Sequence, residues 1–243
     1  MKAGRGRPRA GRAGPRRCRD RAGSRPVSFR IVAQFRLNGS KMLAVDLAGE
    51  TIRALNGAMV AYEGRMAFKR EGMTGGEGLR GALKRKIAGE GMTLMEVTGE
   101  GTVYLASEAA EVTLVRLTGD TLFVESESLL ALEGGLRTGV QFVGLRGMGT
   151  GQGLATTKVE GHGTVAIVSD GPAIALEVTP ETPLSVDPHA YVGHHGQLRQ
   201  DVVTDVNWRT VIGQGSGESV QFRYQGHGLV YVQPAERGGI LEI

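Results

Sequence analysis

Cysteine and tryptophan are almost absent from this sequence of 243 residues. The single Cys18 excludes an intramolecular disulfide and fits a reducing compartment. The single Trp208 does not make a stacking platform for nucleic-acid bases, and we interpret it as core or interface packing. No apolar run approaches the roughly 18 residues that cross a bilayer, and the apolar segment of a secretory signal is missing. We therefore expect a soluble, cytoplasmic protein.

Acidic residues are nearly missing from the first 30 residues, where Asp20 stands against eleven Lys and Arg residues. The other 213 residues hold 18 basic and 24 acidic side chains, so the pI near 9.4 describes the tail and not the body. The tail has few large apolar residues, which predicts disorder over residues 1–33 and a single folded domain over 34–243. It is interpreted as translated upstream DNA, with a natural start near Val27 or Val32; a nucleic-acid-binding arm and a transit peptide are the alternatives.

Glycine is abundant, with 39 residues against 8 prolines and no collagen period, which is typical of many strands joined by turns. One pattern, a glycine and a polar residue or two before an alternating apolar run, recurs at 37–45, 97–105, 159–167 and 224–232. A second element of 16 residues recurs at 49–64, 119–134 and 181–196. Together they predict an all-β fold of about three pseudo-repeats.

The recurring glycines flank single polar residues, which predicts two-residue hairpin turns and makes His162 and His227 turn residues rather than site residues. Likewise, 111–126 is interpreted as two strands around Thr118-Gly119-Asp120, and 165–178 as two strands around 169–172. The predicted turn positions are Gly99, Gly101, Gly161, Gly163, Gly226 and Gly228.

One segment predicts a helix, because Leu79, Leu83 and Ile87 share a face in residues 75–90. Its basic side chains are interpreted as a solvated face; contact with an anionic membrane or an acidic partner is the alternative. These candidates are Arg80, Lys84, Arg85 and Lys86.

Signals for enzymatic chemistry are weak. The G-x-G-x-x-G match at 76–81 is not followed by a βαβ unit, and the glycine-rich segment 147–153 lacks the Gly-Lys-Ser/Thr ending of a phosphate loop. His189, His194 and His195 are the densest metal-ligand candidates, but adjacent residues on a strand point to opposite faces. We expect no cofactor and no catalytic residue, and keep His189 and His194 as weak metal candidates.

Several ordered motifs resemble the altered-inheritance-of-mitochondria protein twenty-four family over roughly residues 35–237. They include GLRGALKRKIAGEGMTLMEVTGEGTVYLA, GDTLFVESESLLAL, GLATTKVEGHGTVAIVSDG and GHGLVYVQP. The resemblance implies a bacterial protein with a fold similar to the tryptophan RNA-binding attenuation protein, a double-stranded β-helix or β-sandwich. It implies no catalytic motif, and fold similarity alone does not carry RNA or tryptophan binding over.

The function predicted from these observations is a non-enzymatic binding or scaffolding module, related to the mitochondrial-biogenesis family. We expect a homo-oligomer, from the fold analogy and because sheet edges need protection. We also expect an unidentified protein partner. The acidic body argues against nucleic acid as a partner, since phosphate contacts dominate that affinity. Two alternatives remain: a metal- or small-ligand-binding β-helix with modest enzymatic activity, and nucleic-acid binding through the basic tail.

Overall fold

The computed structural model describes Met1 and residues 32–70, 93–143, 154–205 and 219–235. The chain divides into the units Met1–Arg30 and Ile31–Ile243, and every described strand belongs to the second unit. The strands are β1 (Gln34–Leu37), β2 (Leu43–Leu55), β3 (Met59–Arg70), β4 (Leu94–Leu105), β5 (Glu111–Glu125), β6 (Leu129–Glu133), β7 (Arg137–Val143), β8 (Leu154–Ser169), β9 (Ile174–Val178), β10 (Leu184–Val186), β11 (Tyr191–Asp205) and β12 (Ser219–Val232).

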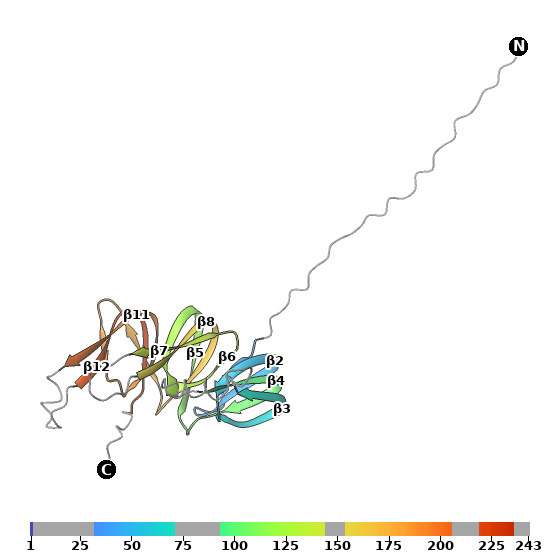
Figure 1. Cartoon of the computed structure of the whole chain (residues 1–243), viewed down its shortest axis with the longest axis horizontal. Helices are drawn as coiled ribbons and strands as arrows, with labels where there is room; N and C mark the ends of the chain where they lie inside the picture. Colours follow the sequence, from blue (N-terminus) through green and yellow to red (C-terminus); the bar gives the residue numbers. More distant parts are fainter. Residues whose placement is uncertain (2–31, 71–92, 144–153, 206–218, 236–243) are drawn as a thin grey trace, which may run out of the picture. The chain divides into compact units, whose positions relative to one another are not determined.

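The fold is all-β, as predicted (Figure 1). All pairs of described strands are antiparallel, and the twelve described strands join into one sheet with the order β10-β12-β11-β5-β8-β6-β2-β4-β3. The strands β1, β7 and β9 pair with β2, β8 and β12. The only helical turn in the described part is a 3₁₀ turn over Ser126–Ser128. No described helix is long and apolar enough to cross a membrane. The helix predicted at 75–90 lies outside the described residues.

The sheet contains three strand groups, each with a central strand that carries a Gly-x-Gly sequence. In the first group, β4 lies between β2 and β3. In the second group, β8 pairs with β5 on one side and with β6 and β7 on the other. In the third group, β12 pairs with the long strand β11 on one side and with β9 and β10 on the other. The second glycine of each central strand faces an apolar residue of the first strand: Leu47 faces Gly101, Leu117 faces Gly163 and Val178 faces Gly228.

The prediction of hairpin turns at the recurring glycines is wrong. Gly99 and Gly101 lie inside β4, Gly161 and Gly163 inside β8, and Gly226 and Gly228 inside β12, each of which runs on without a break. The physical reason is close approach between backbones. A Cβ atom on Gly101 would lie 2.1 Å from the Glu63 carbonyl oxygen, and one on Gly226 would lie 2.2 Å from the Gln197 carbonyl oxygen.

The turn predicted at Thr118-Gly119-Asp120 is also wrong, because β5 continues through it as a bulge. Gly119 takes a φ of +107°, and the Asp120 carboxylate accepts a hydrogen bond from the Thr118 amide at 2.9 Å. Gly49 and Glu50 form the same bulge in β2, where Glu50 accepts from the Ala48 amide at 2.6 Å. The turn predicted at 169–172 is confirmed, because β8 ends at Ser169 and β9 begins at Ile174.

The buried apolar side chains form three clusters that follow the strand groups. The first cluster contains residues of β2 and β4 together with Leu130 and Ala131 of β6. The second is centred on β5 and β8 and includes Val192 of β11. Among the described residues, the buried members of the third cluster all come from the third group: Val178, Val186, Tyr191, Phe222, Tyr224 and Val230. Neighbouring groups are therefore joined by side chains that enter the next cluster.

Candidate functional site

The strand β3 is exposed along almost its whole length. Among the described strands it pairs with β4 alone, so no other described strand pairs with the backbone donors and acceptors on its second side (Figure 1). Val60 is 56% exposed and Tyr62 49% exposed, and Met59 and Phe68 are exposed as well. The rings of Tyr62 and Phe68 meet edge to face, with centroids 5.4 Å apart. An edge strand of 12 residues with exposed apolar side chains and no proline is suited to pair with another strand.

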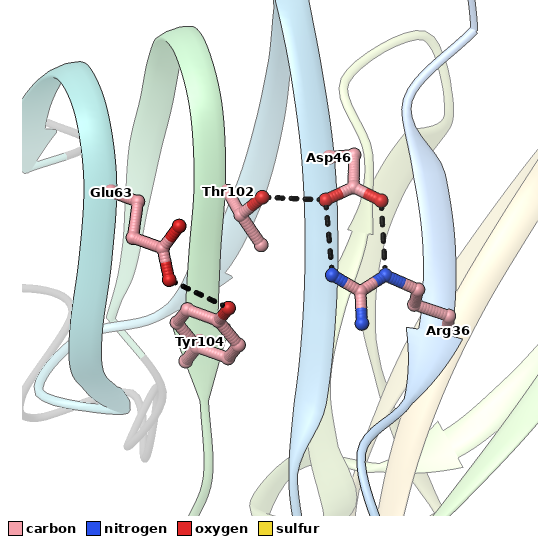
Figure 2. A network of polar contacts seen from close by, with 5 residues as sticks. All are labelled: Arg36, Asp46, Glu63, Thr102 and Tyr104. Carbon is pink, nitrogen blue, oxygen red and sulfur yellow. Dashed lines mark hydrogen bonds and ion pairs between the residues drawn. The ribbon is translucent and has the colours of Figure 1, made fainter.

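A row of polar side chains crosses the first strand group and ends on β3 (Figure 2). Arg36 of β1 donates two hydrogen bonds to the Asp46 carboxylate of β2, at 3.0 and 3.3 Å, and Thr102 of β4 donates a third at 2.6 Å. On the same strand, the Tyr104 hydroxyl donates to the Glu63 carboxylate of β3 at 3.0 Å. The hydrogen bonds from Arg36 and Thr102 hold the pKa of Asp46 below its ordinary value. These contacts hold Asp46 ionised and fix the position of Glu63 near the free edge.

Beside this row, β3 and β4 enclose a shallow, open hollow. It is lined by Tyr62, Gly64, Arg65, Met66, Ala67, Thr98 and Gly99. Arg65 pairs with Glu100 at 2.6 Å, and both side chains are largely exposed, so solvent screens this pair. The hollow is open to solvent and does not enclose a small molecule.

His194, one of the two weak metal candidates, is buried where β11 meets β5. Its ring stacks on Phe123 with centroids 4.9 Å apart, and its Nδ1 lies 2.7 Å from the Tyr191 hydroxyl. Burial, with a smaller contribution from His195, lowers the pKa of His194 to about 4. His194 is therefore neutral at pH 7, packs against aromatic rings, and has a hydrogen-bond partner for Nδ1 in the Tyr191 hydroxyl.

His195, the next residue, has different neighbours, as the alternation along a strand predicts. Its Nδ1 lies 2.9 Å from the Asp120 carboxylate, and its Nε2 lies 3.2 Å from the Tyr231 hydroxyl. Because a carboxylate only accepts, Nδ1 of His195 is the donor to Asp120. Burial alone would raise the pKa of Asp120, but the hydrogen bonds from His195 and the Thr118 amide outweigh it, so the pKa is lowered. The three residues link β5, β11 and β12.

The other predicted site residues do not form a metal cluster in the described part of the chain. His189 is exposed in the segment before β11, and its amide donates to the Asp187 carboxylate at 2.9 Å, as in a turn. Within the described ranges, no three His, Cys, Asp or Glu side chains are placed to hold a metal ion. Residues 2–31 of the tail and the basic candidates Arg80, Lys84, Arg85 and Lys86 lie outside the described part of the chain.

Sequence reasoning missed both β3 and the Asp120–His195–Tyr231 cluster. The segment 59–70 has the apolar and aromatic residues of a strand, but a sequence does not show which strand of a sheet lies at an edge. The cluster joins positions 75 and 36 residues apart, and only the pairing of β5 with β11 and of β11 with β12 brings them together.

Comparison with known proteins supports the family resemblance. The crystal structure of protein SPYM3_0169 from Streptococcus pyogenes is similar, with a TM-score of 0.66 and 20% identity over 84% of this chain and 93% of that one, and this likeness concerns the fold. No curated protein matches the sequence. The family described as mitochondrial biogenesis AIM24 matches residues 35–235, which include every described strand from β2 to β12. The chain therefore belongs to the AIM24 mitochondrial-biogenesis family.

Proposed function

We propose that this chain is a non-enzymatic binding module of the AIM24 family that recognises protein by pairing a strand with β3. The observation that carries the proposal is the exposure of Met59, Val60, Tyr62 and Phe68 on a strand whose second side is free among the described strands. Main-chain hydrogen bonds along such an edge supply affinity, and the apolar side chains supply specificity. A cytoplasmic location and a homo-oligomeric state belong to the same proposal.

The three strand groups support a further part of the proposal, which is that the domain is built from three pseudo-equivalent repeats. The final glycines of the 16-residue elements, Gly64 and Gly196, each face the second glycine of a central strand, Gly101 and Gly228. A fold similar to the tryptophan RNA-binding attenuation protein, as a double-stranded β-helix or β-sandwich, stays a prediction. Membrane contact by the helix predicted at 75–90 and nucleic-acid binding by the tail stay alternatives.

The test uses a photo-crosslinking amino acid in place of Tyr62 in the full chain, expressed in cells. The matched control carries it in place of Val140, which is 48% exposed on β7. We expect a covalent protein adduct after irradiation at position 62 and none at position 140. Absence of any adduct at position 62, with the variant folded by circular dichroism, would overturn the proposal.

A further inference from the structure

The same junction joins neighbouring strand groups twice within this chain. At the first junction, β6 pairs with β2, with Glu133 facing Ile52, Leu132 facing Arg53 and Ala131 facing Ala54. At the second, β11 pairs with β5, with His195 facing Leu122, His194 facing Phe123 and Gly193 facing Val124. In each case the last strand of one group adds to the first strand of the next.

The two junctions have equivalent registers. Ile52 and Leu122 each face the residue two positions before the first glycine of their central strand, Val97 and Val159. In the third group that place is taken by Leu184, which faces Tyr224 two positions before Gly226. Glu133 and His195 each precede the closing glycine of a 16-residue element, and in the first group Glu63 holds that place. The third junction would therefore pair Glu63 with Leu184.

A β-bulge marks the last strand of every group at the same place. The register shifts between Leu129 and Ala131, between Tyr191 and Gly193, and between Met59 and Ala61. The bulged residues Leu130 and Val192 are 0% exposed, and each enters the apolar cluster of the neighbouring group. The equivalent residue of β3, Val60, is 56% exposed. Leu130 and Val192 are thus buried by a neighbouring strand group, whereas no such group covers Val60 within the described chain.

From this equivalence we propose that β3 pairs with β10 of a second copy of the chain, in the register Glu63 to Leu184, Tyr62 to Ser185 and Ala61 to Val186. Val60 then enters the third apolar cluster of that copy, whose described buried members all come from the third group. The contact is head to tail, so it builds a closed ring or a filament. This inference rests on the proposed function of β3 and names its partner.

The polar contacts at the edge fit this partner. At the second junction, His195 bonds to Tyr231 of its own group and to Asp120 of the next, two residues before Leu122. Glu63 repeats the inner bond, to Tyr104 at 3.0 Å. In the second copy, the residue two positions before Leu184 is Thr182, whose hydroxyl is a suitable donor to the Glu63 carboxylate.

The test is a disulfide between chains, in the full chain with Cys18→Ser. Tyr62→Cys and Ser185→Cys are introduced in two separately tagged chains that are expressed together and then oxidised. Directly opposed residues on antiparallel strands have the Cα separation that a disulfide requires. We expect a cross-linked heterodimer on a non-reducing gel, and none when Val140→Cys replaces Tyr62→Cys.

Two other outcomes would overturn the inference. A disulfide between two Tyr62→Cys chains would show that β3 pairs with β3, and no disulfide in any combination would remove the self-association. In either case an adduct to a different protein in the photo-crosslinking experiment at position 62 would leave the proposed binding function intact.

As a second measurement, Val60→Asp should raise the apparent dissociation constant of the oligomer at least about 10-fold, because it places a charge in an apolar cluster. The control Val140→Asp should leave that dissociation constant unchanged.

Discussion

The paired histidines show how adjacent positions on one strand acquire different chemistry. His194 is stacked on Phe123 in the buried junction, and His195 bonds to Asp120 and Tyr231 at its margin. Strand alternation alone predicts that the two rings separate, but it does not say which ring is buried. Because burial lowers the pKa of His194, this residue makes the free energy of unfolding depend on pH.

The stability of the domain should fall in mild acid because of His194. Its pKa of about 4 in the folded chain lies below the ordinary value of 6.5, so the unfolded chain binds a proton first as the pH falls. The folded state is therefore most stable, with respect to this group, above pH 6.5, and it loses that stability progressively as the pH falls to about 4. Between pH 7.5 and pH 5 we expect the free energy of unfolding to drop by about 2 kcal/mol from this group.

Urea denaturation of the wild type and of His194→Gln at both pH values measures this contribution. The amide of glutamine keeps a hydrogen-bonding group near Tyr191 but does not titrate. All other titrating groups are shared, so the difference between the two pH dependences isolates His194. Equal pH dependences in the two proteins would contradict the buried, neutral state of the ring.

The Gly-x-Gly strands show where sequence patterns mislead about an element. Glycine followed by an alternating apolar run is compatible both with a hairpin turn and with a strand that another backbone approaches closely. The prediction chose the turn, and β4, β8 and β12 continue through these glycines. Contacts between residues distant in sequence, such as Gly64 with Gly101, determine that the chain stays extended at these glycines. A local sequence pattern does not contain such contacts.

Replacing Gly101 by alanine should be strongly destabilising. Its φ is +139°, and the added Cβ would lie 2.1 Å from the Glu63 carbonyl oxygen on the facing strand. We expect a loss of at least about 2 kcal/mol in the free energy of unfolding, measured by urea denaturation. The control is Gly135→Ala, where no atom lies within 4 Å of the added Cβ and φ is not in the left-handed region. That change should stay within about 0.5 kcal/mol.

For the whole molecule, the edge of β3 that no other described strand covers links stability to assembly. If a second copy covers Val60 and Tyr62, association stabilises the folded chain by mass action. The Tm of the wild type should then rise with protein concentration, by about 5 °C between 1 and 100 µM. Differential scanning fluorimetry of wild type and Val60→Asp over this range is the measurement. A Tm of the wild type independent of concentration would argue that β3 is not covered by another copy.

Much of the architecture could be predicted from local patterns. The all-β class, the turn at 169–172 and the recurring elements follow from glycine placement and apolar alternation, which depend on neighbours in the chain. Family membership could be recognised in the same way, because the ordered motifs lie in the sequence itself.

Two features depend on the tertiary structure: which strands pair, and which strand edge no other described strand covers. The contact of His195 with Asp120, the burial of Leu130 and Val192 in neighbouring clusters, and the exposure of Val60 all depend on strand order. Strand order is set by pairings between distant segments, whose free energies are summed over the sheet and are not contained in any single stretch. Local patterns in the chain predicted that strands form, whereas the order of the strands places β3 and its apolar side chains at an edge that no other described strand covers.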